Sequence, residues 1–70
     1  MIPLSFSPVG SEMTVKALGG KPDVKRHLES LGFSSGFKVT VTSVISGNVI
    51  VKVKESRIAI SQEMAGKIMV

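Results

Sequence analysis

The sequence contains no cysteine, so neither disulfides nor thiolate metal sites can hold the chain together. Small secreted domains often depend on disulfides when their core is thin, and the lack of cysteine therefore favours a reducing compartment. The N-terminal segment 1–5 has no basic start and no apolar stretch behind it, unlike a secretory signal peptide. We therefore expect a cytoplasmic protein.

Long apolar runs, aromatic residues and catalytic groups are also scarce. No stretch approaches the roughly 20 apolar residues that cross a bilayer. Tryptophan and tyrosine are absent and there are three phenylalanines, which leaves no aromatic platform for proline-rich peptides or stacked bases. The one histidine, His27, and the five acidic residues follow no catalytic motif. The composition argues against an enzyme and favours a protein that binds a partner.

The residues that are present suit one folded domain spanning 1–70. Apolar residues make up 43% of the chain and charged residues 20%, a balance typical of a globular domain. A chain of 70 residues has room for one core, and no linker, repeat or low-complexity segment divides it. A domain of this size buries only about 60% of the surface of its unfolded chain, so each core position matters.

Alternation of apolar and polar residues predicts most of the chain to be β-strand. Ser46-Gly47-Asn48 has the composition of a tight turn and predicts a hairpin between two of these strands. Ahead of the first strand, we expect Leu4, Phe6 and Val9 to pack inward as a short edge element. The expected strands cover residues 12–17, 37–42, 49–54, 57–60 and 67–70.

Residues 22–31 change to the helical period. Val24, Leu28 and Leu31 fall on one face, while Pro22 suits the first helical position and Gly32 the position after the last turn. Residues 61–65 predict a single helical turn. The fold class is therefore mainly β: a small barrel of about five strands, with a short helix inserted after the first long strand and a helical turn before the last strand.

The positive charge is scattered along the sequence. The formal net charge is +4, with no basic run, and a solvated surface is the simplest interpretation. The alternative is a basic face assembled by folding, for which Arg26, Lys52, Lys54 and Arg57 are the candidate partner-binding residues. Such a face would suit an acidic protein or, as an alternative function, the phosphate backbone of a nucleic acid.

His27 is also the leading candidate for a metal ligand. Asp23 precedes it by one helical turn, so both side chains can reach one ion. The simpler interpretation is a surface hydrogen bond between the two. Because two ligands make a weak site, a metal centre would need further acids, such as Glu29 or Glu63, or a second chain.

With this pattern laid out, the chain resembles the ferrous iron transport protein A family (FeoA) over nearly its whole length. Most of the matching positions also have a structural role, because leucine, glycine, phenylalanine and valine specify a fold. The motifs that carry the resemblance are Arg26-His27-Leu28-x-x-Leu31-Gly32-Phe33-x-x-Gly36-x-x-Val39-x-Val41, Arg57-Ile58-Ala59-Ile60 and Ala65-x-x-Ile68-x-Val70.

The resemblance implies an SH3-like barrel and a function in ferrous iron uptake. It implies a cytoplasmic accessory protein that binds the GTPase part of a membrane iron permease, with transition metal ion binding, iron in particular, as an associated property. Association between copies is left open. The same fold resembles the C-terminal domain of iron-dependent repressors, but this chain supplies no DNA-binding domain of its own.

Overall fold

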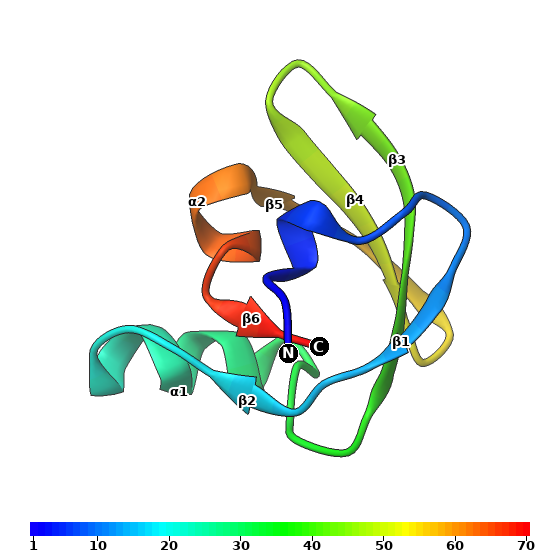
Figure 1. Ribbon diagram of the computed structural model, residues 1–70. Helices are drawn as coiled ribbons and strands as arrows, with labels where there is room; N and C mark the ends of the chain where they lie inside the picture. The colour runs from blue at the N-terminus through cyan, green and yellow to red at the C-terminus, as the bar shows by residue number, and fades with distance from the viewer.

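The computed structural model describes residues 1–70 as two antiparallel sheets with short helices (Figure 1). The larger sheet has the strand order β1-β3-β4-β5, and the smaller pairs β2 with β6. The prediction of a mainly β fold with one inserted helix and a helical turn before the last strand is confirmed. In chain order the elements are η1 (Leu4–Phe6), β1 (Glu12–Thr14), β2 (Ala17–Leu18), α1 (Pro22–Ser30), β3 (Lys38–Ile45), β4 (Asn48–Val53), β5 (Ser56–Ser61), α2 (Gln62–Ala65) and β6 (Ile68–Met69).

The first predicted strand is two short strands that belong to different sheets. The Val15 amide donates to the Phe37 carbonyl at 2.8 Å, and the next amide, that of Lys16, donates to the Met69 carbonyl at 2.8 Å. The chain therefore changes partner between adjacent residues, which raises the number of strands to six. Alternation could not reveal this change, because both strands present their inward residues to one shared core.

The β3–β4 hairpin closes through a two-residue turn. Ser46 and Gly47 have φ of 49° and 81°, the positive values of the turn type that matches the twist of paired strands. β3 continues to Ile45, beyond its predicted end, and a register shift between Val41 and Ser43 interrupts its pairing with β4. The alternation within β4 is confirmed, because its three valines all point inward and are buried.

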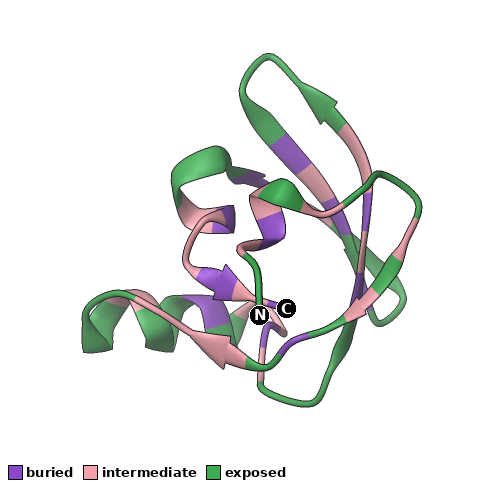
Figure 2. Cartoon of the chain, in the orientation of Figure 1, coloured by how far each residue is buried: buried purple, intermediate pink, exposed green.

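The core lies between the two sheets and contains only apolar side chains (Figure 2). Leu4 is fully buried as expected, but Phe6 and Val9 are 75% and 59% exposed, so the prediction that they pack inward is wrong. Residues 4–6 form a 3-10 turn, in which alternate residues do not share a side as they do in a strand. The buried residues are Leu4, Val15, Leu28, Phe33, Val39, Val41, Val49, Val51, Val53, Ile60, Ala65, Ile68 and Val70.

Helix α1 ends in a motif that positions two core residues. The Phe33 amide donates to the Leu28 carbonyl at 3.0 Å and the Gly32 amide donates to the Glu29 carbonyl at 3.0 Å, the paired bonds of a Schellman motif. Gly32 has the positive φ, 104°, that this motif requires. Leu28 and Phe33 occupy the two positions that an apolar contact usually joins in this motif, and both are fully buried members of the same core cluster.

We expect Gly32→Ala to destabilise the fold more than Gly36→Ala. Both glycines have positive φ, so both substitutions add backbone strain of about 1–2 kcal/mol. Only at Gly32 would the new Cβ lie 3.0 Å from Cγ1 of buried Val53, while Gly36 faces open space. Urea denaturation of both variants should show a further loss of about 1 kcal/mol or more for Gly32→Ala. Equal losses would show that the contact with Val53 relaxes freely.

The two ends of the chain are hydrogen-bonded to each other. The Ile2 amide donates to the Val70 carbonyl at 2.9 Å, and the Val70 amide donates back to the Ile2 carbonyl at 2.8 Å. Figure 1 shows the N- and C-termini side by side. Nearby, the predicted helical turn is confirmed as α2, where Ser61 Oγ accepts from the Met64 amide at 3.2 Å.

Candidate partner-binding surface

The outward side chains of β3, β4 and β5 form one solvent-facing surface, which we call the outer face. The register places Thr40, Lys52 and Arg57 in one row across the three strands. In the next row, Ile50 lies between Ser43 and Ala59. Because side chains alternate between the two sides of a sheet, these residues point away from the buried valines of β4.

One end of the outer face is basic. Lys52 and Arg57 are direct cross-strand partners, and both are exposed. The structure contains one ion pair, between Lys38 Nζ and Glu12 Oε1 at 3.8 Å, so neither Lys52 nor Arg57 is paired with an acid. Lys54 follows in the turn after β4, where its Nζ lies 4.6 Å from the centre of the Phe37 ring.

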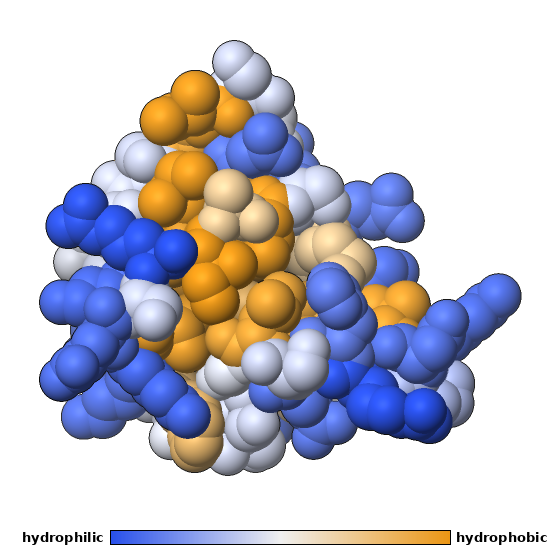
Figure 3. Space-filling model, turned by 180° about the vertical axis from the view of Figure 1, so that it is seen from behind, coloured by the Kyte–Doolittle hydropathy of each residue, from blue (hydrophilic) through white to orange (hydrophobic).

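The other end of the outer face is apolar. Ile50 is half-buried and Ala59 is exposed opposite it, while Ile45, near the hairpin tip, is 58% exposed. Figure 3 shows an apolar area over the rear of the molecule, flanked on the left and at the lower right by hydrophilic side chains. The outer face thus joins a basic end to an apolar end.

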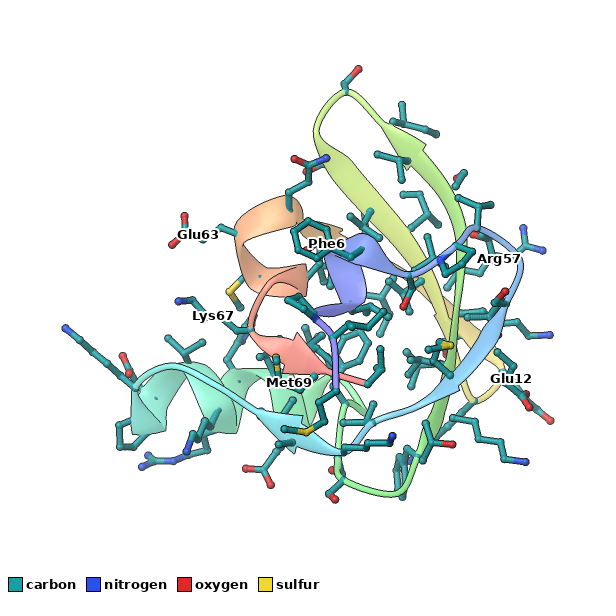
Figure 4. The ribbon with its side chains drawn as sticks, in the orientation of Figure 1. Phe6, Glu12, Arg57, Glu63, Lys67 and Met69 are labelled. Carbon is teal, nitrogen blue, oxygen red and sulfur yellow. The ribbon has the colours of Figure 1, made fainter.

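Three of the four predicted partner-binding residues come together. Lys52, Lys54 and Arg57 lie on one hairpin, β4–β5, as their spacing in the sequence suggested. Arg26 does not join them, because it lies on α1. Figure 4 shows Arg57 on the side of the molecule away from that helix.

The predicted metal ligands form no cluster. Asp23 and His27 are both exposed on α1, and the structure contains no hydrogen bond between them. No group of three or more histidine, cysteine or acidic side chains is close enough to hold an ion. Figure 4 shows Glu63 projecting outward from α2, apart from α1. Within one chain, these residues do not fit a closed metal site.

A small surface hollow lies beside α1. Its volume is about 230 Å³, and it is lined by Leu18, Lys25, Glu29 and Ser35. Ligand pockets usually exceed about 300 Å³ and are mostly apolar. One apolar residue and two opposite charges make this hollow a poor ligand site.

No helix in the structure has the length and apolarity needed to cross a bilayer.

The apolar end of the outer face was not predicted from the sequence. One signal was available: in β4 the alternation that buries Val49 and Val51 also turns Ile50 outward, next to Lys52. An isoleucine at a solvent-facing strand position is a candidate contact residue. The neighbouring Ile45 could not be assigned to this side without the register shift in β3.

Two comparisons of the sequence with known proteins agree on a family. The model of the FeoA domain family matches residues 2–70. A protein of Methanocaldococcus jannaschii named as an Fe(2+) transport protein A is 39% identical over 70 residues. The match covers 100% of this chain and 85% of that relative.

Similar solved structures support the same family and its fold. A crystal structure of an iron uptake regulatory protein (FeoA) superposes with a TM-score of 0.88 at 28% identity, covering 96% of this chain and 89% of that one. The zinc complex of Stenotrophomonas maltophilia FeoA, described as an SH3 domain protein, gives 0.85 at 21% identity and covers 99% and 88%. A manganese-dependent transcriptional repressor gives 0.84 at 20% identity and covers 94% of this chain but 38% of the repressor.

The last two similarities concern the fold alone. They confirm the expected SH3-like architecture. The expected resemblance to part of a repressor is also confirmed, although iron-dependent repressors were expected and this one is manganese-dependent. The family itself rests on the match over residues 2–70 and on the full-length similarity to the archaeal relative. The chain belongs to the FeoA domain family.

Proposed function

We propose that this chain is a non-catalytic accessory protein of ferrous iron uptake, and that it binds the cytosolic GTPase part of a membrane iron permease. The observation that carries the proposal is the family match over residues 2–70, together with a relative named as an Fe(2+) transport protein A. In this function the protein works in the cytoplasm, and Fe²⁺ is the cargo of the permease.

The side chains of the molecule are consistent with a binding function. The buried residues are all apolar, and the one buried side-chain polar atom without a hydrogen-bond partner is the single hydroxyl oxygen of Ser7, which has no acid, base or nucleophile paired with it. The surface offers instead the outer face, with charge at one end and aliphatic side chains at the other. Exposed apolar surface next to charge is typical of protein interfaces.

A direct role in holding iron has less support. Asp23 and His27 supply two ligands in one chain, and a further ligand set would have to come from a partner or a second copy. Metal binding by this pair stays a prediction. Anaerobic titration with Fe²⁺, followed by the ring resonances of His27, is its direct test.

We expect the purified chain to bind the isolated GTPase domain of a ferrous iron permease from the same organism. Transient regulatory contacts of this kind typically have a Kd on the order of micromolar. Isothermal titration calorimetry measures the affinity, with an unrelated GTPase domain of similar size as the control. If both proteins are folded and no heat of binding appears at high micromolar concentration, the proposed function is wrong.

A further inference from the structure

We propose that the outer face of β3, β4 and β5 is the surface that binds the partner, and that it recognises an acidic protein segment with aliphatic side chains beside its carboxylates. This inference rests on the proposed function, because it names the chemistry by which the permease's cytosolic part would be recognised. The basic end of the face is Lys52, Lys54 and Arg57. The apolar end is Ile45, Ile50 and Ala59.

The fold leaves positive charge uncompensated at the basic end of the outer face. Lys52 and Arg57 are directly opposite each other in the β4–β5 register, where side chains of like charge destabilise a sheet. Glu12, in the same row on β1, is paired with Lys38. Glu55, in the adjacent turn, forms no ion pair. In the isolated domain no acid forms an ion pair with Lys52 or Arg57, and an acidic partner would supply one.

The apolar end continues the same face beyond the cations. Ile50 and Ala59 are cross-strand partners one row from Lys52 and Arg57, and Ile45 lies further along β3. Single exposed apolar residues are common on protein surfaces. Here Ile45, half-buried Ile50 and Ala59 lie on one face of the sheet, next to cations that pair with no acid. Such a surface can bury aliphatic area and also select a partner by its charge.

The same two features disfavour other occupants. A second copy cannot neutralise the basic end, because a two-fold pairing centred there would oppose Lys52 and Arg57 with themselves. A pairing centred on the apolar end would leave those cations unpaired. A nucleic acid would satisfy the cations through phosphates but would not use Ile45, Ile50 or Ala59. An acidic protein segment uses both ends.

The decisive variant is Arg57→Glu, because we expect it to lower the affinity for the GTPase domain without lowering the stability of the fold. It converts a like-charge cross-strand pair into an opposite-charge pair with Lys52, so the melting temperature should stay the same or rise. Affinity for the GTPase domain should fall by about tenfold or more, because a repulsive charge now faces the acidic partner. The matched control is Arg26→Glu on α1, which makes the same change in net charge away from the outer face and should leave affinity unchanged.

A second variant probes the apolar end separately. Ile50→Thr keeps a β-branched side chain on the strand but removes aliphatic surface, and it should weaken binding at both low and high salt. The charge contribution, in contrast, should decline as salt screens it. In a ¹⁵N-labelled chain, titration with the GTPase domain should move the amide resonances of residues 45–59 and leave those of α1 in place.

The outcomes separate this inference from the proposed function. If the wild-type chain does not bind the GTPase domain, the proposed function fails. If it binds, and Arg57→Glu and Ile50→Thr bind equally well, the function stands and the outer face is not the interface. Loss of binding in Arg26→Glu alone would place the interface on α1. The inference is also wrong if the wild-type chain binds a random-sequence DNA duplex and Arg57→Glu abolishes that binding but still binds the GTPase domain. The basic end would then be a phosphate-binding surface. A dimer in sedimentation that Ile50→Thr dissociates would overturn it in favour of a second copy.

Discussion

Phe33→Ala will remove most of the free energy of unfolding of this domain and sharply lower its melting temperature. Phe33 is fully buried and is the largest of the fully buried side chains. Replacing a buried phenylalanine by alanine costs about 3–5 kcal/mol through lost transfer free energy and the cavity left behind. Folded domains are stable by roughly 5–15 kcal/mol, and a chain this short lies toward the lower limit. Thermal unfolding followed by circular dichroism measures the loss.

Phe6→Ala is the matched control for this variant. The chemical change is identical, but Phe6 is 75% exposed, so little apolar contact is removed. Its melting curve should coincide with that of the wild-type protein within the small changes typical of surface substitutions, about 0.5 kcal/mol. A folded Phe33→Ala variant with an unchanged melting temperature would show that Phe33 does not hold the core together.

Leu28→Ala will have the second largest effect, a loss of about 2–5 kcal/mol. Leu28 is the one fully buried residue of α1, and it is the position through which the helix is anchored to the core. A helix of nine residues is too short to persist without such packing. Chemical denaturation should therefore show a lower midpoint, and far-ultraviolet circular dichroism should show less helix.

Lys25→Ala separates packing from helix propensity. Lys25 is exposed on the same helix, and alanine is the stronger helix former. Lys25→Ala should therefore be neutral or slightly stabilising. A loss equal to that of Leu28→Ala would mean that the helix depends on its own sequence preferences and not on the core contact.

Much of the fold could be predicted because its signals are local. The three inward valines of β4 follow the strand period, and the positions of Pro22 and Gly32 mark the limits of α1. The change of sheet between Val15 and Lys16 could not be predicted, because it is decided by which carbonyls those amides reach. The same holds for Phe6, whose orientation depends on a 3-10 turn that the apolar pattern does not encode.

The candidate site was predicted in part for a similar reason. Lys52, Lys54 and Arg57 are near in sequence, so a hairpin brings them together in any register close to the observed one. The direct opposition of Lys52 and Arg57 depends on the turn at residues 54 and 55, where Lys54 has a φ of 56°. The grouping of Ile45 with Ile50 depends on a register shift, which a period of two cannot predict.

The mutual hydrogen bonds between Ile2 and Val70 affect how the molecule can open. Terminal residues of most domains fray independently, since each end is held by its own neighbours. Here each end supplies both a donor and an acceptor to the other, so fraying at one end removes the support of the other. An isolated β-bridge between Pro3 and Met69 adds one more backbone contact between the two ends, next to η1 and β6. Local opening of this protein therefore involves its first and last residues as one cooperative unit.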